Sequence, residues 1–362
     1  MALSTILVIN PGSTSTKIAL FTGGEKVFQE DVVHPEEVLK KFKDIPSQLA
    51  FRMETLMDAL RHRAVDITKL DAVAVRGGLM RPVKSGVYRV TKEMAEDLRD
   101  SNTLWGREHA SNLGALLGLQ LAEEYGIPAF TADPVTVDEL DEIARVSGVP
   151  EIKRQSLLHA LNIKERIRCA SRDLGLKVEE TNFIAVHMGG GTTVAAIRRG
   201  RVVDVNNALL GMGPFSPLRA GALPTGDLLE MAYSGEYAEP SLKRKLVFES
   251  GLKGYLGTGD VREIERRIEA GDKAAELMLS AMAYQVSKEI GAMAAALEGK
   301  VAAIILTGGV AFSARVAKEV SGRVEFIARV LVYPGQAEME ALAWHAQAAL
   351  SGEERVLHYG QD

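Results

Sequence analysis

The sequence predicts an α/β protein with two similarly built domains. Its 362 residues, 46% of them hydrophobic and 25% charged, are enough for two separate cores. Short apolar runs rich in β-branched residues alternate with segments whose apolar residues recur at helical spacing. A strand-turn-strand pattern at the start returns in the second half. Pro150 marks the expected boundary between a first domain at 1–150 and a second at 151–338.

The first domain opens with two apolar runs, residues 5–9 and 18–22, on either side of a polar turn. A glycine lets the backbone approach an anion, turn amides and hydroxyls donate to its oxygens, and a lysine compensates its charge. The turn residues that could hold a phosphate in this way are Asn10, Gly12, Ser13, Thr14, Ser15 and Lys17. An ordinary polar hairpin is the alternative, so the phosphate interpretation depends on the motifs that follow.

The rest of the first domain is expected to alternate strands and helices. Gly23-Gly24 forms a tight turn into the third strand, and Pro46 interrupts the first helical stretch. The expected strands are residues 26–33, 71–75 and 129–132, the expected helices are 35–63, 91–99 and 108–125, and the segment leading to Val90 is expected to be a loop.

The second domain is expected to repeat the first. Residues 186–193 can be laid over residues 9–16 so that strand, polar residue, glycine and paired hydroxyls match. Two such halves would point both turns into one cleft and grip phosphates from two sides. The other expected elements are a helix at 155–174, a strand at 202–206, a helix at 276–298, a strand at 302–306, a helix from Val310 and a helix at 337–350.

A third glycine-rich turn, Thr307-Gly308-Gly309, joins the strand at 302–306 to the helix that begins near Val310. Glycines in such a turn let a nucleotide approach the backbone and meet a helix N-terminus. Close packing of the helix on the strand is the alternative interpretation. A third turn of this kind favours nucleotide binding.

Charge and motif content exclude several classes of protein. A net charge of −5 provides no basic surface for nucleic acid. The longest apolar helix contains Gln285, Lys288 and Glu289 and therefore is not expected to span a membrane. The first residues lack the basic start of a signal peptide, which predicts a cytoplasmic protein. Cys169 is the only cysteine, and P-loop, zinc-binding and hydrolase motifs are absent, so phosphate chemistry remains.

Three motifs resemble, in order and spacing, those of the acetokinase family of the actin-like ATPase superfamily: NPGSTSTK at 10–17, HMGGGTT at 187–193 and LTGGVAFS at 306–313. Further segments are similar to the branch of the family that acts on butyrate: AVRGGL at 74–79, SGVY at 85–88, RQSLLHALN at 154–162 and YPGQAEMEALA at 333–343. Together they extend over nearly the whole chain.

The resemblance implies two actin-like, ribonuclease H-like domains with a cleft between them, the first completed by a C-terminal helix at about 339–362. It also implies reversible phosphoryl transfer from ATP to a short carboxylic acid, butyrate or a branched analogue, which gives an acyl phosphate and ADP with Mg²⁺. The alternatives are acetate or propionate as the acid, or an actin-like ATPase without an acid substrate. Members typically dimerise through the second domain, so a homo-oligomer is expected.

By position, the resemblance assigns catalysis to Arg76, Asp133, His187 and Lys17. It assigns Mg²⁺ to Asn10 and Glu338, with Glu340 as the competitor of Glu338. Nucleotide and phosphate contacts fall on three turns: Asn10, Gly12, Ser13, Thr14 and Ser15; Gly189, Gly190, Gly191 and Thr192; and Thr307, Gly308, Gly309 and Val310. The remaining histidines except His159 are expected to be structural: His34, His62, His109, His345 and His358.

The chain departs from the acetate kinase pattern at two places. Gln155 replaces the first of two family histidines, whereas His159 keeps the second. A family arginine is missing near Pro224, and Arg219 is a possible substitute. Arg76 is the better candidate for the other family arginine.

The acid substrate needs no general base, because a carboxylate with a pKa of roughly 4 to 5 is already ionised at neutral pH. The reaction instead needs compensation of phosphoryl charge, which we expect from Arg76, His187 and Mg²⁺. Lys17 is expected to hold the phosphate. A sugar kinase of the same fold would need an aspartate base and would therefore differ in pH dependence.

Overall fold

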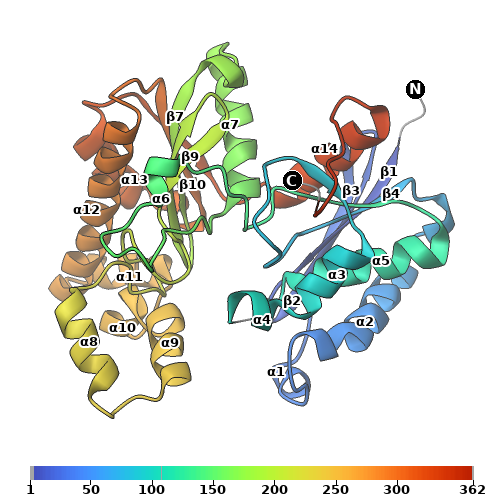
Figure 1. Ribbon diagram of the computed structural model, residues 1–362, viewed down its shortest axis with the longest axis horizontal. Coiled ribbons are helices and arrows are strands. Elements are labelled where there is room, and N and C mark those ends of the chain that lie inside the picture. The colour runs from blue at the N-terminus through green and yellow to red at the C-terminus, as the bar shows by residue number, and fades with distance from the viewer. Residues whose placement is uncertain (1–3, 107, 361–362) are drawn as a thin grey trace. The chain divides into compact units, whose positions relative to one another are not determined.

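The computed structural model describes residues 4–106 and 108–360 and divides into two compact units. The first unit comprises Met1–Val137 together with Ala337–Asp362, and the second comprises Asp138–Gln336. The first boundary therefore lies at Val137 instead of near Pro150. Each unit is built around a β-sheet of its own (Figure 1).

The first unit contains a six-stranded sheet with the order β3-β2-β1-β4-β6-β5. Its strands are β1 (Thr5–Pro11), β2 (Ser15–Thr22), β3 (Glu25–Val33), β4 (Ala72–Val75), β5 (Val87–Arg89) and β6 (Ala129–Ala132). β1, β2 and β3 form an antiparallel meander, and β4 and β6 continue the sheet parallel to β1. The central strands are apolar on both faces because helices cover both sides.

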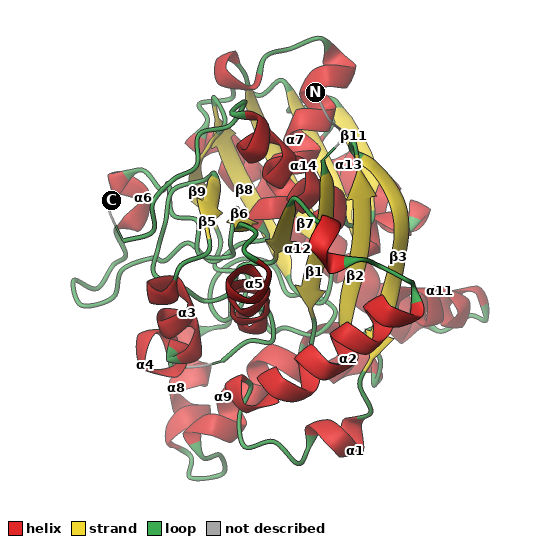
Figure 2. Cartoon of the chain, turned by 90° about the vertical axis from the view of Figure 1, so that its right-hand side faces the viewer, coloured by secondary structure: helices red, strands yellow, loops and turns green. Residues whose placement is uncertain are grey.

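Helices cover the two faces of this sheet. α5 packs on β1, β4 and β6, α14 packs on the same strands from the other side, and α2 contacts β2 and β3 (Figures 1 and 2). The helices are α1 (Glu36–Leu39), α2 (Leu49–His62), α3 (Lys92–Arg99), α4 (Ser101–Trp105), α5 (Asn112–Tyr125) and α14 (Glu338–Ser351), with 3-10 turns at Pro46–Gln48 and Ile67–Lys69.

The second unit contains a five-stranded sheet with the order β11-β10-β7-β8-β9. Its strands are β7 (Asn182–Met188), β8 (Thr192–Arg198), β9 (Arg201–Val205), β10 (Ala303–Gly308) and β11 (Val330–Pro334). α7 packs on β7 and β10 from one side, and α12 packs on β8 from the other (Figure 1).

The helices of the second unit are α6 (Glu142–Arg145), α7 (Ala160–Leu174), α8 (Thr225–Tyr233), α9 (Glu239–Phe248), α10 (Gly251–Leu256), α11 (Val261–Glu269), α12 (Lys273–Ala296) and α13 (Ala314–Val324), with 3-10 turns at Val178–Glu180 and Gly309–Phe312. Among the described residues, no helix combines the length and the apolar content that a membrane crossing requires. α12 corresponds to the apolar helix expected at 276–298, and it packs against α13 and the sheet.

The second sheet repeats the first strand by strand, with β7, β8, β9, β10 and β11 in the places of β1, β2, β3, β4 and β6. This order confirms the predicted duplication. The expected register is wrong by one residue, however. Pro11 faces Thr16 in the first hairpin, whereas Met188 faces Thr192 in the second. The second turn is therefore one residue shorter, and Thr192 corresponds to Thr16 instead of Ser15.

Three further details differ from the expectations. β5 lies in the segment expected to be a loop, and its three residues are too few to give a period-two signal. α7 begins at Ala160 instead of Gln155, because the preceding residues contact the second sheet: Arg154 bonds Asp204 of β9 at 2.6 Å. The four helices between β9 and α12, namely α8, α9, α10 and α11, were not predicted.

Candidate active site

The first turn comprises residues 12–15, which lie between the paired residues Pro11 of β1 and Thr16 of β2. The Gly12 amide donates to the Ser15 carbonyl at 2.7 Å, so this amide closes the turn and does not serve an anion. Ser13 and Thr14 are exposed at the tip. Their hydroxyls and amides are therefore the groups of the turn that a ligand can reach from solvent.

Two buried side chains that the sequence did not reveal support this turn. Arg52 of α2 donates to the carbonyls of Ser13 and Ser15 and to the Thr16 hydroxyl. His34 lies with Nε2 2.9 Å from the same hydroxyl. Burial lowers the pKa of His34 from 6.5 to about 4, with a further contribution from the Arg52 charge, and burial lowers the pKa of Arg52 to about 10. At neutral pH the histidine is uncharged and the arginine is charged.

Three predicted residues meet where β1, β4 and α14 come together. Asn10 Nδ2 donates to Glu338 Oε2 at 2.9 Å, and Arg76 Nη1 forms an ion pair with the same oxygen. Glu338 is buried at the first residue of α14. Its competitor Glu340 instead pairs with Lys26 at 2.8 Å on the surface. The structure therefore brings Glu338, and not Glu340, to Asn10 and Arg76.

Lys17 lies on the same face of the sheet as Asn10. The two residues are directly opposite each other in the ladder between β1 and β2, and opposite residues of an antiparallel pair project to one side. Lys17 also faces Asp31 of β3. The predicted phosphate-binding lysine is thus half-buried near the carboxyl end of β1, next to the Asn10 cluster.

Asp133 follows β6 and is buried with a backbone φ of 40°, which non-glycine residues rarely adopt. Its Oδ1 accepts from Ser85 Oγ at 2.6 Å and from the Gly86 amide at 3.0 Å. Its Oδ2 lies 3.5 Å from His345 Nε2, and His345 Nδ1 lies 2.6 Å from Glu354 Oε2. His345 therefore does more than pack in the core, since it helps to fix a predicted catalytic carboxylate. Strained backbone of this kind is often found at functional sites.

The second turn, residues 189–191, joins β7 to β8. The Gly189 amide donates to the Gly191 carbonyl at 3.0 Å, which closes this turn with one residue fewer than the bond from Gly12 to Ser15 in the first turn. Arg219 packs against Gly191, and a Cβ there would overlap both the guanidinium and the Ala208 carbonyl, so any side chain would force one of them to move. The Thr192 hydroxyl is buried and bonds no other described residue. Arg219, the possible substitute for the missing arginine, thus lies against the backbone of this turn.

His187 lies near the carboxyl end of β7 and is completely buried. Its ring stacks on that of His159, with centroids 4.0 Å apart and planes 11° apart, and His159 Nδ1 lies 2.8 Å from Thr193 Oγ1. A direct contact of His187 with phosphate stays a prediction. Gln155, the replacement for the other family histidine, is exposed.

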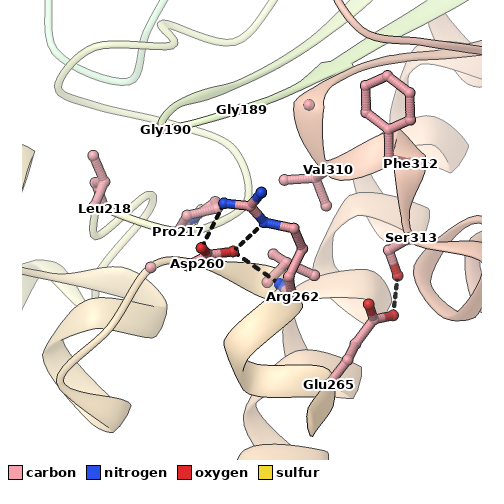
Figure 3. Close-up of a pocket in the computed structure, with 13 residues that line it drawn as sticks. Gly189, Gly190, Pro217, Leu218, Asp260, Arg262, Glu265, Val310, Phe312 and Ser313 are labelled. Atoms are coloured by element: carbon pink, nitrogen blue, oxygen red, sulfur yellow. Dashed lines mark hydrogen bonds and ion pairs between the residues drawn. The ribbon is translucent and has the colours of Figure 1, made fainter.

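A cavity of about 670 Å³ lies next to the second and third turns (Figure 3). Its lining mixes glycine backbone, apolar side chains and charged side chains: Gly189, Gly190, Pro217, Leu218, Gly259, Asp260, Val261, Arg262, Glu265, Gly309, Val310, Phe312 and Ser313. Arg262 Nη2 pairs with Asp260 Oδ2 at 2.7 Å, and Ser313 Oγ donates to Glu265 Oε1 at 2.6 Å. None of these four polar residues was predicted to line the site, because Asp260, Arg262 and Glu265 come from a segment of the chain in which no motif was found.

Two residues of the third turn lie on the wall of this cavity, and two lie in the interior of the second unit. Gly309 and Val310 line the cavity. Thr307 is buried, and its hydroxyl bonds Asn162 and the Gly335 carbonyl at 3.2 and 3.1 Å. Gly308 has a φ of 89°, and a Cβ there would overlap the Met188 backbone. The expected nucleotide contacts at Gly309 and Val310 thus lie on the cavity wall, whereas Thr307 and Gly308 hold β10 against its neighbours.

Oxygen atoms of the Asn10 cluster suit a hard divalent cation. Within 4–106 and 108–360, no group of three or more histidine, cysteine, aspartate or glutamate side chains is placed to hold a metal. Magnesium needs no such group, because it keeps several waters and binds one or two carboxylates besides phosphate. Glu338, with Asn10 beside it, provides oxygen donors of the required kind.

Comparisons with known proteins agree in family and fold. Residues 164–331 match the model of the acetokinase family. The chain is 50% identical, over 98% of its length and 99% of the relative, to the probable butyrate kinase 2 of Caldanaerobacter subterraneus subsp. tengcongensis.

Two solved structures share the fold. The acetate kinase of Porphyromonas gingivalis superposes with a TM-score of 0.76 at 22% identity, covering 96% of this chain and 100% of that one. A propionate kinase of Francisella tularensis gives a TM-score of 0.74 at 17% identity, covering 94% and 98%. The predicted α/β fold with two actin-like domains is thereby confirmed.

Proposed function

This chain is a member of the acetokinase family, and we propose that it transfers a phosphoryl group from ATP to the carboxylate of a short-chain fatty acid. The products are an acyl phosphate and ADP, and the reaction is reversible. Butyrate or a branched analogue is the proposed acid, and a cytoplasmic location is proposed with it. The observation that carries the proposal is the 50% identity, along nearly the whole chain, to a relative named as a butyrate kinase.

We assign the nucleotide to the cavity of the second unit. Leu218, Val310 and the exposed ring of Phe312 provide apolar surface for a base. Asp260 and Glu265 provide carboxylate oxygens that can accept hydrogen bonds from ribose hydroxyls. Glycine backbone of the second and third turns leaves room for the diphosphate.

We assign the transferred phosphoryl group and the acid to residues of the first unit. The acid carboxylate attacks phosphorus with its own charged oxygen, and the bond from phosphorus to the ADP oxygen breaks. The positive charges of Lys17 and Arg76 compensate the negative charges of the acid carboxylate and the phosphoryl group as the two come together. The hydroxyls of Ser13 and Thr14 at the tip of the turn donate to phosphoryl oxygens. Asp133, fixed by its hydrogen bonds, supplies an oriented carboxylate.

Magnesium is proposed to bind at Glu338, with Asn10 next to it and Asp133 acting through water. When bound, the ion neutralises phosphate charge during transfer. Arg76 already occupies one Glu338 oxygen in this structure, which leaves the other carboxylate oxygen for the ion or its waters.

Hydroxylamine trapping tests the proposal directly. The protein is incubated with ATP, Mg²⁺, hydroxylamine and one acid from a panel of acetate, propionate, butyrate, isobutyrate and valerate. We expect acyl hydroxamate with the highest kcat/KM for butyrate or isobutyrate. A highest kcat/KM for acetate or propionate would support the alternative acid. ATP hydrolysis that is independent of every acid, without hydroxamate, would contradict the kinase proposal.

We also propose that the protein forms a homo-oligomer through α8 and its surroundings. α8 has no buried residue, although it carries Leu229, Met231 and Tyr233. Exposed apolar residues gathered in this way are typical of a surface that a partner covers. A cavity of about 630 Å³ beside α8, partly lined by Leu223 and Tyr255, extends the apolar surface.

A further inference from the structure

Arg52 is a buried cation directly behind the first turn. The residue comes from α2 and has no solvent exposure. Its Nη1 donates to the Ser15 carbonyl at 3.2 Å and to Thr16 Oγ1 at 3.1 Å, and its Nη2 donates to the Ser13 carbonyl at 3.1 Å. Nε and Nη2 both donate to Gln48 Oε1, at 3.2 and 3.0 Å. All five guanidinium hydrogens are thus bonded to uncharged acceptors.

The Arg52 charge has no anionic partner in the part of the chain that the structure describes. The nearby His34 adds no negative charge, since an imidazole side chain is either neutral or positively charged. A buried charge is normally paired, because leaving it unpaired in a low-dielectric interior is unfavourable. Every hydrogen bond of the Arg52 guanidinium is made, but its positive charge is not compensated. This combination favours the binding of an anion on the other side of the turn.

The hydrogen bonds of Arg52 also set the direction of two peptide groups. In a trans peptide the carbonyl and the following amide point to opposite sides. Because the carbonyls of Ser13 and Ser15 point towards Arg52, the amides of Thr14 and Thr16 point away from it. The Thr14 amide, at the exposed tip, is thereby turned away from the interior, where it can donate to a phosphate oxygen.

We propose that Arg52 is a positioning residue that orients the first turn for a phosphoryl group and supplies the buried positive charge that the group neutralises. The inference rests on the proposed function in naming the phosphoryl group as the anion. It adds a charge on this turn that is separate from Lys17 and from the family arginine missing near Pro224.

The substitution Gln48→Glu tests the effect of the Arg52 charge without changing the position of the Arg52 side chain. The substituted carboxylate accepts the same two hydrogen bonds, so the arginine stays in place, but the site becomes neutral. We expect unchanged or higher thermal stability and an approximately tenfold or greater weakening of phosphate binding. The measurements are the melting temperature and calorimetric titration of the full chain with inorganic phosphate and with acetyl phosphate. Affinities within twofold of wild type in a stably folded Gln48→Glu protein would overturn the proposal.

A pair of substitutions at Arg52 provides a second test. Arg52→Lys keeps the charge and loses the fork of donors, whereas Arg52→Gln loses both. We expect both to lower the melting temperature, but only Arg52→Gln to lose phosphate affinity by tenfold or more. Arg61→Gln, on the exposed end of the same helix, is the control and should match wild type. Equal affinity of the Lys and Gln variants would contradict a role for the charge.

These binding measurements are independent of the acid-kinase assay. Wild-type protein that binds phosphate but forms no hydroxamate would contradict the proposed function and leave the Arg52 test intact. The opposite result is also distinguishable. If wild-type protein forms hydroxamate, but the Gln48→Glu variant keeps the wild-type KM for acyl phosphate and the wild-type phosphate affinity, only the inference about Arg52 is contradicted.

Discussion

At the residue scale, buried His34 makes the stability of the protein depend on pH. Its pKa is about 4 in the folded state and 6.5 ordinarily. Between these values the unfolded chain binds a proton that the folded chain does not, so the free energy of unfolding falls as the pH falls from 6.5 to 4. The full effect is roughly 3 kcal/mol, and above pH 7 it vanishes.

The substitution His34→Gln tests this dependence, because it removes the titration and keeps a polar side chain near Thr16. We expect the melting temperature of the variant to fall less than that of wild type between pH 7 and pH 4.5. His62→Gln, at the exposed end of α2, should follow the wild-type curve. Parallel curves for wild type and His34→Gln would show that another group is responsible.

Glu338 and Glu340 form a matched pair on one helix. Glu338→Gln keeps an acceptor for Asn10 but removes the charge that pairs with Arg76 and that we propose for binding Mg²⁺, so we expect kcat to fall by roughly a hundredfold or more. Glu340→Gln removes only a surface ion pair with Lys26, and we expect kcat to stay within about twofold. The measurement is steady-state kinetics with butyrate at saturating ATP and Mg²⁺. Equal losses in the two variants would contradict the assignment of Glu338.

The sequence predicts the residues of the turns and, through family resemblance, Arg76, Asp133 and Glu338 as site residues. It did not reveal Arg52 or His345. Arg52 lies in a helix whose neighbouring charged residues face solvent, and a periodic pattern does not single out one charged residue as buried. His345 meets Asp133 only because α14 returns to the first unit. Contacts between segments so far apart in the chain leave no mark in a local pattern.

At the element scale, the first unit is completed by a helix from the end of the chain, whereas the second unit is one continuous segment. α7 follows the strands of the first unit but packs on β7 and β10 of the second. α14 follows the strands of the second unit but packs on β1, β4 and β6 of the first. The first unit therefore needs the last segment of the chain both for its core and for Glu338 and His345.

Leu342 on α14 tests this dependence, since it is 1% exposed. Leu342→Ala should destabilise the protein by about 2 to 5 kcal/mol through the cavity that it leaves. Because this substitution destabilises the first unit, amide hydrogen exchange should become faster in β1 and β4 but not in β7 and β10. Ile290→Ala on α12, a fully buried residue, should give the reverse pattern. Uniform acceleration in both sheets after either substitution would contradict this division.

Elements with long or strongly apolar patterns were predictable, whereas those defined by tertiary contacts were not. The buried strands β1, β4, β6, β7 and β10 and the long α12 correspond to continuous apolar runs or clear helical spacing. β5 has three residues and exists because it pairs with β6 at the sheet edge. The one-residue difference between the two hairpins depends on turn length, which matching residue types cannot determine.

At the scale of the whole molecule, duplication has produced two units of one topology with different polar residues. The hairpin registers place His187 where the first unit has Asn10, and Thr193 where it has Lys17. The first unit thus has an amide and an ammonium at positions where the second has an imidazole and a hydroxyl. This difference favours a division of roles, with phosphoryl charge handled by the first unit and the nucleotide by the second.

The apolar surface of α8 predicts that the complete molecule is an oligomer. A helix without a buried residue gains little from packing within its own chain, so the exposed Leu229 and Tyr233 of α8 favour a second copy that covers them. We expect light scattering to give a multiple of the chain mass for wild type. The double substitution Leu229→Glu and Tyr233→Glu should lower that mass, because two carboxylates cannot be buried without partners.

Phe326→Glu is the matched control for this double variant. Phe326 is 83% exposed in the same unit but lies after α13, away from the residues of α8 and its neighbouring cavity. Its substitution should therefore leave the mass unchanged. If Phe326→Glu dissociates the assembly and the α8 variant does not, the interface lies elsewhere in the second unit. A wild-type protein that is monomeric at all concentrations would contradict the oligomer itself.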